Sequence, residues 1–324
     1  MVLGERNNPE LSNREVLRLR TTLRKMSIPM LYKFANEYNV EIPDKARDKY
    51  TILNSFIDEL TYKSKREILS KYGDSGRASS FIYKSREKTP DIKDVFQRAK
   101  KLLEYKPESK NWERFPYFDE VEVDYLTNSL RIRFHYLLGS VILFDEETGR
   151  SIEHRKLFNG IVIYRPRSTV LEIRVKHRSM ARIMRARIPV YLGLEPFISI
   201  NLMEKELNRK FIKWINSLNS ATIELPLSEV SGSLIISARK CLDLRTAKRY
   251  KDELEHGRLR NGHVTINHNE RDINFHIYFK ECHKKYTLFS SEEDIEYVVN
   301  AIEKISEGYE FAKPEKLLAD FFKE

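Results

Sequence analysis

The spacing of apolar residues changes near residue 116, and this change restricts the folds that the chain can adopt. Before residue 108 apolar residues recur at helical spacing, for example Ile52, Leu53, Phe56 and Leu60. From residue 121 they alternate with polar residues, as in VEVDYLTNSLRIRF. Helices followed by such strands are typical of an α+β protein. The sequence therefore predicts an α+β fold, with an N-terminal helical bundle followed by two antiparallel-sheet-plus-helix units.

Three domains follow from this pattern in a chain of 324 residues. We expect a helical domain at residues 1–108, an α+β domain with an arginine-rich segment at 115–220, and a second α+β domain at 222–324. The last domain ends in an amphipathic segment, KPEKLLADFFKE, which favours a C-terminal helix. Residues 71–90 are polar, basic and without apolar periodicity, so they predict a loop.

Alternation also predicts the register of two hairpins. In the first, a two-residue loop at 127–128 pairs two carboxylates with two guanidinium groups: Glu122 with Arg133 and Asp124 with Arg131. In the second, a loop at 268–271 places His263 opposite His276. Two imidazoles could bind a metal ion, but a third ligand would have to come from elsewhere. Two polar side chains on a solvated face are the simpler interpretation.

The net charge of +10 is unevenly distributed, because residues 151–250 alone carry +11. A positive field of this kind favours an anionic partner such as nucleic acid. The chain has a single glutamine, Gln97, and is rich in Lys, Arg and Glu, which is typical of a thermophile. That composition explains many charges of both signs, but it does not explain the imbalance.

The basic run KHRSMARIMRARIP at residues 176–189 contains no acidic residue. A helix from residue 178 would place Arg178, Arg182 and Arg185 on one face. Arg187 would fall on the apolar side of that helix, so we expect the helix to end before it, and Pro189 opposes further continuation. Alternatively, the segment becomes a strand after residue 184. Either geometry gathers at least two arginines on one side, although an ordinary solvated helix face would look the same.

Guanidinium groups suit phosphate oxygens, so the basic segments are candidates for contact with a nucleic-acid backbone. A second, weaker basic face lies in RKCLDLRTAKRYK, and HGRLRNGH adds Arg258 and Arg260 on a glycine-flanked loop. Acidic residues accompany this second face, so a solvated helix is the simpler interpretation there. Outside the N-terminal domain, the candidate nucleic-acid-binding residues are Arg165, Arg167, Arg174, Lys176, Arg178, Arg182, Arg185, Arg187, Arg245, Lys248 and Arg249.

Two family resemblances point in the same direction. LRKMSIPMLYKFANEYNVEIPDKARDKYTILNSFIDEL, within residues 22–60, resembles a SAP-type module, which would imply DNA contacts for Lys45, Arg47 and Lys49. Its loop, PDKARDK, departs from the small or glycine residue usual in that family. The order of a helical bundle, VEVDYLTNSLRIRFHY, GIVIYRPRS and VLEIRVKHRSMARIMRAR in residues 1–190 is similar to the centromere protein N family. That likeness implies a pyrin-like helical domain, an α+β domain and an architectural role on nucleosomal DNA.

The alternatives are a metal-dependent nuclease or nucleic-acid processing factor, and a protein-interaction scaffold that uses the C-terminal helix. A nuclease could use Glu172 and Lys176, but a Glu-x-Lys core would need lysine where Arg174 stands. The sequence contains no Walker A, GxGxxG, GxSxG or HExxH motif. We therefore expect no catalytic residues, no cofactor and no metal.

The expected location is a reducing intracellular compartment, either the cytoplasm or the nucleoid or nucleus. The segment MVLGERNNPE lacks the apolar stretch of a secretory signal, and Cys241 and Cys282 stand alone. We expect no membrane partner, because no apolar run approaches the roughly 20 residues that span a bilayer. The sequence thus predicts a non-enzymatic protein that contacts the backbone of double-stranded DNA with low sequence specificity. RNA and single-stranded DNA are alternative ligands.

Overall fold

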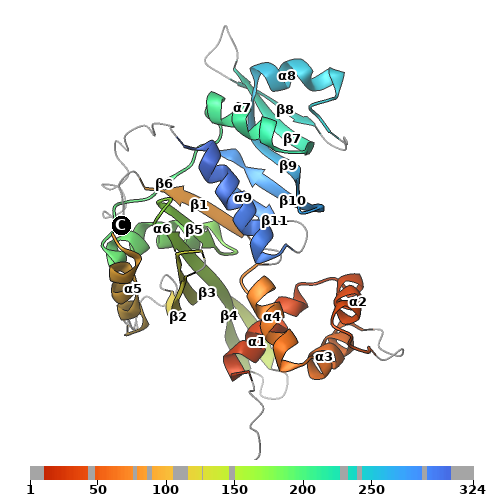
Figure 1. Cartoon of the computed structure of the whole chain (residues 1–324), viewed down its shortest axis with the longest axis vertical. Coiled ribbons are helices and arrows are strands. Elements are labelled where there is room, and N and C mark those ends of the chain that lie inside the picture. The colour runs from red at the N-terminus through yellow and green to blue at the C-terminus, as the bar shows by residue number, and fades with distance from the viewer. Residues whose placement is uncertain are drawn as a thin grey trace, which may run out of the picture.

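The fold is α+β, with helices around one large antiparallel sheet (Figure 1). The computed structural model describes residues 11–42, 48–75, 79–85, 90–104, 116–125, 127–145, 150–226, 233–238, 243–286 and 290–307. The C-terminal amphipathic segment lies outside these residues. None of the helices in the described ranges is long and apolar enough to cross a membrane.

Four helices precede the sheet and share a hydrophobic cluster of their own: α1 (Asn13–Arg24), α2 (Ile28–Glu37), α3 (Lys49–Glu59) and α4 (Tyr62–Tyr72). A capping box begins α1, because the Ser12 side chain accepts from the Glu15 backbone N–H and the Glu15 side chain accepts from the Ser12 backbone N–H. Phe34 and Phe56 are buried in the cluster, and Leu31 and Ile52 are fully covered. These helices therefore bury the face that the sequence marks as apolar.

The sheet is continuous from the second predicted unit into the third. Its main path is β2 (Tyr117–Asp124), β3 (Ser129–Asp145), β4 (Arg150–Arg165), β5 (Val170–Arg174), β1 (Ser79–Lys84), β11 (His283–Tyr286), β10 (Arg271–Tyr278), β9 (Arg258–His268), β7 (Ser217–Pro226) and β8 (Ser233–Ala238). The short strand β6 (Ile198–Ser199) pairs with β1 outside this path.

Strand β1 joins the two halves of the sheet, which corrects the prediction of a loop throughout 71–90. It pairs antiparallel with β5 on one side and with β11 on the other. Phe81, Ile82 and Tyr83 are all buried, because helices cover both faces of the sheet here. A strand covered on both faces shows no alternation in its sequence. The period-two pattern that identified the other strands was therefore missing.

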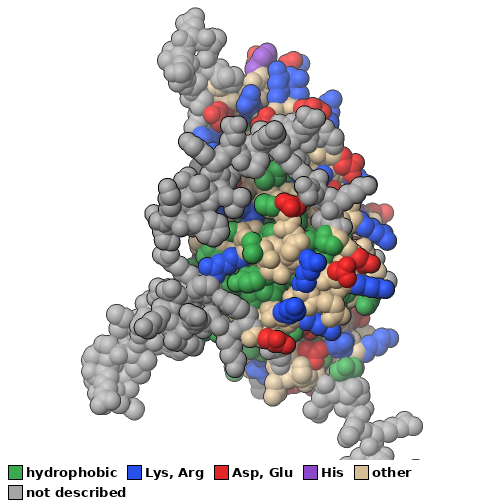
Figure 2. All heavy atoms as spheres, turned by 90° about the vertical axis from the view of Figure 1, so that its left-hand side faces the viewer, with side chains coloured by type: hydrophobic (Ala, Val, Ile, Leu, Met, Phe, Trp, Pro, Cys, Tyr) green, Lys and Arg blue, Asp and Glu red, His purple; other side chains and the backbone are tan. Residues whose placement is uncertain are grey.

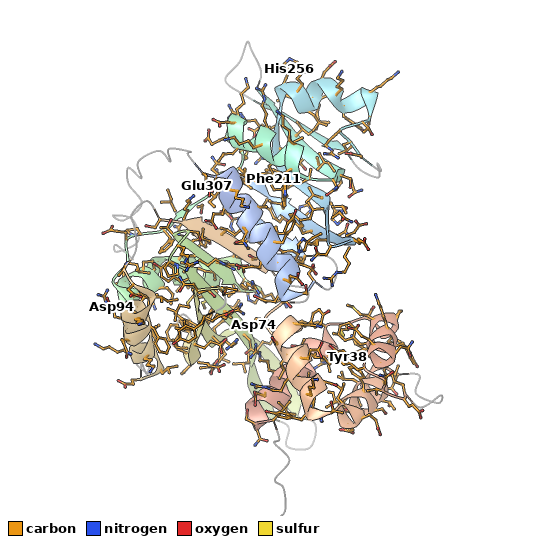
Figure 3. All side chains as sticks on the ribbon, in the orientation of Figure 1. Tyr38, Asp74, Asp94, Phe211, His256 and Glu307 are labelled. Atoms are coloured by element: carbon orange, nitrogen blue, oxygen red, sulfur yellow. The ribbon has the colours of Figure 1, made fainter. Side chains whose placement is uncertain are left out.

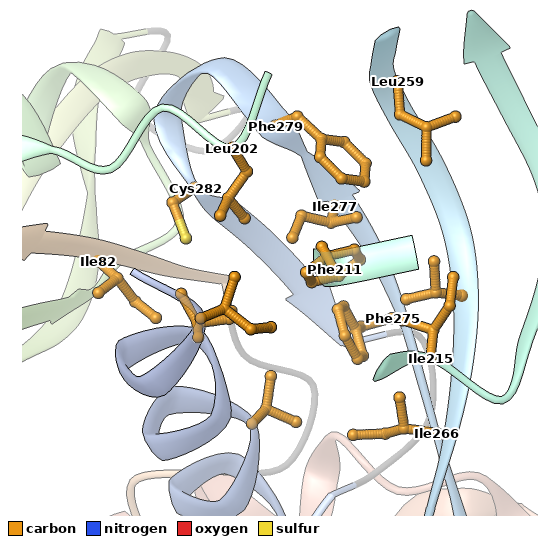
Figure 4. Close-up of a cluster of buried hydrophobic side chains, with 14 of the residues drawn as sticks. Ile82, Leu202, Phe211, Ile215, Leu259, Ile266, Phe275, Ile277, Phe279 and Cys282 are labelled. Carbon is orange, nitrogen blue, oxygen red and sulfur yellow. The ribbon is translucent and has the colours of Figure 1, made fainter. Parts of the chain in front are cut away.

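Helices cover both faces of the sheet. On one face α5 (Ile92–Lys100) and α6 (Arg178–Leu192) pack against β1–β5 and enclose a hydrophobic cluster. On the other, α7 (Lys205–Trp214) and α9 (Glu292–Ile305) enclose a second cluster, part of which is drawn in Figure 4. In Figure 1, α9 crosses on the viewer's side of the strands. The short helix α8 (Lys251–His256) packs near β7.

Helix α6 is longer than the sequence predicted, since it continues through Pro189 to Leu192. A proline inside a helix costs about 3 kcal/mol through its missing N–H and its ring clash. Burial of a large aliphatic side chain contributes about 1.5–3 kcal/mol, and both Ile188 and Leu192 are fully buried. The two buried residues around the proline therefore offset its cost. Gly193 then ends the helix in the left-handed conformation, at φ +62°.

One predicted hairpin register is confirmed and the other is wrong. His263 pairs with His276, and Val264 pairs with Phe275, as predicted for β9 and β10. In the β2–β3 hairpin, Glu122 lies opposite Arg131 and Glu120 lies opposite Arg133. The register differs by two residues because the loop begins at residue 125 and not at 127, so that Asp124 lies opposite Ser129. The Asp124 carboxylate accepts from the Thr127 N–H within this turn. A shift of two keeps every side chain on its predicted face.

Candidate nucleic-acid interface

Two of the predicted phosphate ligands, Arg165 and Arg174, lie inside the molecule rather than on its surface. Arg174 Nε donates to Glu172 Oε1 at 2.8 Å, and its Nη2 donates to Glu172 Oε2 at 3.1 Å. Arg165 Nη2 donates to the same Glu172 Oε2 at 3.0 Å. All three side chains are buried between the sheet and α9. The interpretation of these two arginines as part of an accessible phosphate-binding surface is therefore wrong.

This buried ion cluster extends across the junction between α4 and the sheet. Asp74, which follows α4, receives two hydrogen bonds from Arg133 of β3, at 3.1 and 2.7 Å, and lies 2.9 Å from Arg18 Nη2. Arg174 Nη1 also donates to Glu292 of α9 at 2.6 Å. Figure 3 shows Asp74 where the helices meet the sheet. The cluster thus ties the N-terminal helices, the sheet and α9 together.

The electrostatics of the cluster favour its charged state. Burial by itself would raise the pKa of Glu172, but Arg174 and Arg165 outweigh it and hold that pKa well below its usual range. Burial likewise opposes ionisation of Asp74, and Arg133 and Arg18 reverse the effect and lower its pKa. Glu172 is fully buried and also accepts from Ser80 Oγ at 2.6 Å. A carboxylate enclosed in this way cannot reach a phosphodiester, which removes the basis for a nuclease built on Glu172.

Lys284 of β11 belongs to the same interior but has a different environment. Its side chain is fully buried, and its Nζ makes no hydrogen bond to any atom of the described residues. Burial lowers the pKa of Lys284 to about 8, although the negative charge of Glu172 opposes this shift. The interior therefore holds an ammonium group whose charge is disfavoured.

The arginine row of α6 does reach the surface. Arg178 and Arg182 side chains are 54% and 52% exposed, and both contact the carboxylate of Glu281, which follows β10. Arg185, on the same helix face, is half-buried; its guanidinium lies 5.5 Å from the centre of the Tyr83 ring. The helical interpretation of the run is confirmed, and two of its three arginines are well exposed. A single carboxylate leaves this pair with a positive excess.

A groove of about 660 Å³ begins at this row and brings together segments far apart in the sequence. Its lining residues come from α6, β7, β9, β10, β11, the turn before α7 and the turn after β10: Arg178, Asn201, Met203, Glu204, Glu224, Arg258, Arg260, Asn261, Tyr278, Lys280, Glu281 and His283. Arg258 and Arg260 lie on strand β9 and not on the expected loop. Tyr278 and Lys280 were not identified from the sequence as candidate binding residues. A single tyrosine and a single lysine at the end of a strand form no motif that distinguishes them from other surface residues.

The other predicted basic residues do not join this groove. Lys176 is exposed, with its Nζ 5.0 Å from the centre of the Phe158 ring, and Arg187 is half-buried. Arg167 is exposed in the β4–β5 turn, and Lys248 is exposed before α8. Lys45 and Arg47, as well as the side chain of Arg249, lie outside the described residues. The candidate surface is therefore smaller than the sequence suggested.

Two further predicted basic residues bind backbone carbonyl groups. Lys49, at the start of α3, donates through Nζ to the carbonyl of Arg24 at 2.8 Å, which ties α3 to α1. Arg245 donates to the carboxylate of Asp243 and through Nη1 to the carbonyl of Ile215 at 2.6 Å. Both contacts are structural, and Arg245 holds the chain before α8 against the end of α7. We therefore leave both residues out of the candidate surface.

The predicted cross-strand histidine pair is present, but the described residues supply no third metal ligand beside it. His263 and His276 are directly opposite each other and half-buried. Burial lowers the pKa of both imidazoles, so both are neutral at pH 7. Within the described ranges no three His, Cys, Asp or Glu side chains gather closely enough to hold a metal ion. Cys282 is buried, which raises the pKa of its thiol to about 12.

The positive excess does not form one continuous basic surface on the face that includes α5. Figure 2 shows this face, where Lys and Arg side chains are interspersed with Asp and Glu. Hydrophobic side chains appear between them. Local groupings such as the α6 row are therefore a more specific feature of this surface than the net charge of the chain.

Comparison of the sequence with known proteins does not assign the chain to a family. No protein-family model matches the sequence. A search of curated proteins found no match either. The function is therefore inferred from the residues of the groove and their surroundings.

Proposed function

We propose that this protein binds nucleic acid through its phosphate backbone at the groove beside α6. One observation supports this most directly: Arg178 and Arg182 are exposed on one face of α6, at the edge of a groove that also presents Arg258 and Arg260 from β9. Planar guanidinium groups bind phosphate oxygens in pairs of hydrogen bonds. Double-stranded DNA, bound with low sequence specificity in an architectural or maintenance role, is the first ligand to test.

The balance of positive and negative side chains in the groove determines the affinity for nucleic acid that we expect. Its lining contains four Lys or Arg side chains and three Glu side chains, and Arg182 adds a further cation at the edge. Glu281 competes with phosphate for Arg178 and Arg182. A site with this balance neutralises about two phosphates, which corresponds to a salt slope of about −1.8 on duplex DNA. Binding is thus expected to be modest and to depend on ionic strength.

The test is a salt titration of duplex DNA, single-stranded DNA and RNA binding with the double variant Arg178→Gln/Arg182→Gln. We expect weaker binding and a salt slope close to zero, because each lost phosphate contact lowers the magnitude of the slope by about 0.9. The matched control is Arg167→Gln/Lys248→Gln, which removes the same charge from exposed residues that are not among those lining the groove. Equal losses in the two variants would mean that net charge, and not this groove, attracts the ligand.

We further propose that α1–α4 act as a helical domain beside two sheet-plus-helix units, with Lys45 and Arg47 contributing to DNA contact. The separate hydrophobic cluster of α1–α4 supports the first part. The SAP-type resemblance supports the second. Lys45→Gln/Arg47→Gln should then weaken duplex binding further in the Arg178→Gln/Arg182→Gln background, whereas additional loss from Lys49→Gln should be accompanied by lower stability.

A further inference from the structure

Three aromatic rings form a stack across neighbouring strands on the sheet face opposite α9. Phe81 of β1 and His283 of β11 are directly paired, with ring centres 4.0 Å apart and planes 5° apart. His283 and Tyr278 of β10 are also paired, with centres 5.2 Å apart and planes 9° apart. The alternate residues Ile82 and Lys284 are buried toward α9. The ring stack therefore belongs to the other face.

The stack ends at Tyr278, because the residue opposite it on β9 is Asn261, which carries no ring. Tyr278 is 43% exposed, and both it and Asn261 line the groove beside α6. Toward its inner end the stack is covered, since Phe81 is buried in the cluster under α6. The aromatic surface is thus available at one end only, and that end lies in the groove.

The groove beside α6 offers contacts for both the base and the phosphate of a nucleotide. A planar base can continue the stack on the Tyr278 ring, and stacking accepts any base because each has a π face. Arg178, Arg258 and Arg260 lie around the same groove and suit the flanking phosphates. The volume of about 660 Å³ falls within the roughly 300–1,000 Å³ of small-ligand sites. His283 is neutral at pH 7 because burial lowers its pKa to about 4.

We propose that Tyr278 stacks an unpaired base of a single-stranded nucleic acid, while Arg178, Arg258 and Arg260 hold the phosphates on either side of that base. This inference rests on the proposed function and names its ligand more narrowly. Bases inside a duplex are already stacked on one another and cannot reach a ring in a groove. A single-stranded nucleic acid should therefore bind more tightly than a duplex that makes the same number of phosphate contacts.

The experiment uses the full chain and a single-stranded DNA of about twelve nucleotides with 2-aminopurine near its centre, within the usual range of single-strand site sizes. The variants are Tyr278→Leu and Tyr278→Phe, with Tyr125→Leu as a matched control, because Tyr125 is 80% exposed in the β2–β3 loop. Probes are the single strand, the same sequence as a duplex, its RNA equivalent and the mononucleotide. Circular dichroism and thermal unfolding check that each variant is folded.

We expect Tyr278→Leu to weaken single-strand binding by about 5- to 150-fold, the range for loss of one stacked base, and to change duplex binding less than twofold. Tyr278→Phe should retain affinity, and Tyr125→Leu should have no effect. The quenching of 2-aminopurine at saturating protein should disappear in Tyr278→Leu alone. Equal binding of the mononucleotide and the strand would overturn the assignment of a strand as ligand.

Two other outcomes separate this inference from the proposed function. If Tyr278→Leu binds the single strand normally while Arg178→Gln/Arg182→Gln does not, the stacking site is wrong and the backbone groove stands. If no nucleic-acid probe binds the wild-type protein, the proposed function fails and the stacking site fails with it. A Tyr278→Leu loss of the same size on duplex and single strand would also contradict base stacking.

Discussion

Arg174 and Arg178 are four residues apart, yet they occupy opposite environments. Arg174 ends β5 and is buried with Glu172 and Glu292, whereas Arg178 begins α6 and is more than half exposed beside Glu281. The strand directs alternate side chains toward α9, and the following helix directs its arginine row away from the sheet. A basic run in sequence is therefore not one surface, because the change from strand to helix divides it.

The two environments also differ in energy. Breaking a buried ion pair leaves an uncompensated charge in a low-dielectric interior, which costs about 3–5 kcal/mol. An exposed ion pair contributes about 0–1 kcal/mol, because water and salt screen it. The buried cluster should therefore govern stability, and the exposed row should govern binding. The predictions below test this separation, from the largest expected effect to the smallest.

The same substitution at two glutamates gives the largest contrast. Glu172→Gln leaves Arg165 and Arg174 without their shared anion, so we expect a loss of about 3–5 kcal/mol in the free energy of unfolding. Glu281→Gln should change that free energy by less than about 1 kcal/mol. Urea denaturation at pH 7 measures both. Equal losses would show that the surface pair is as structural as the buried one.

A second contrast concerns two carboxylates that contact the same guanidinium. Asp74 and Glu120 both accept from Arg133, but the Asp74 side chain is only 9% exposed and that of Glu120 is 44% exposed. Asp74→Asn should cost about 3 kcal/mol and loosen α4 from the sheet, whereas Glu120→Gln should cost less than about 1 kcal/mol. Unfolding curves give the energies. Hydrogen exchange in α4 should rise in Asp74→Asn alone; unchanged exchange there would exclude a tethering role for Asp74.

Lys284 should behave oppositely to its buried neighbours, because its ammonium group lacks a hydrogen-bond acceptor among the described atoms. We expect Lys284→Met to raise the free energy of unfolding at pH 7 by about 2 kcal/mol, within the range for replacing buried charges by apolar groups. A net destabilisation at pH 7 would show that the positive charge is required by Glu172.

The sign of the pH dependence provides a separate check on Lys284. Its folded pKa of about 8 lies below the ordinary value of 10.5. Below pH 8 both folded and unfolded states hold the proton, so the folded state carries the full cost of the charge. Between these two values only the unfolded state keeps the proton, so wild-type stability rises with pH. The advantage of Lys284→Met should therefore shrink from pH 8 to 10.5; an advantage independent of pH would contradict the lowered pKa.

The smallest effect is a gain in binding from Glu281→Gln. Removal of this carboxylate releases Arg178 and Arg182 for phosphate, and an exposed pair is equivalent to about a twofold to fivefold change in affinity. A salt titration with duplex and single-stranded DNA measures it, with Glu120→Gln as a control of equal charge. Unaltered or weaker binding in Glu281→Gln would place the phosphate contacts elsewhere.

Local sequence patterns correctly predicted the elements whose information lies within a few residues. The helical spacing of Ile52 and Phe56 predicted the helix α3, in which both are buried, and the β9–β10 register followed from alternating apolar residues. The spacing of Arg178, Arg182 and Arg185 predicted a shared helix face. Each of these features depends on neighbours along one helix or one hairpin, where periodicity is sufficient.

Only the tertiary structure decided which charges are buried and which segments form the groove. Arg174 needs Glu292, more than a hundred residues away, and β1 joins the two halves of the sheet without any alternation in its sequence. The groove likewise combines α6 with Tyr278 and Arg260. These contacts arise because strands distant in sequence pair side by side and a covering helix closes over them. Periodicity along the chain describes which face a residue takes, but not which distant partner will cover it.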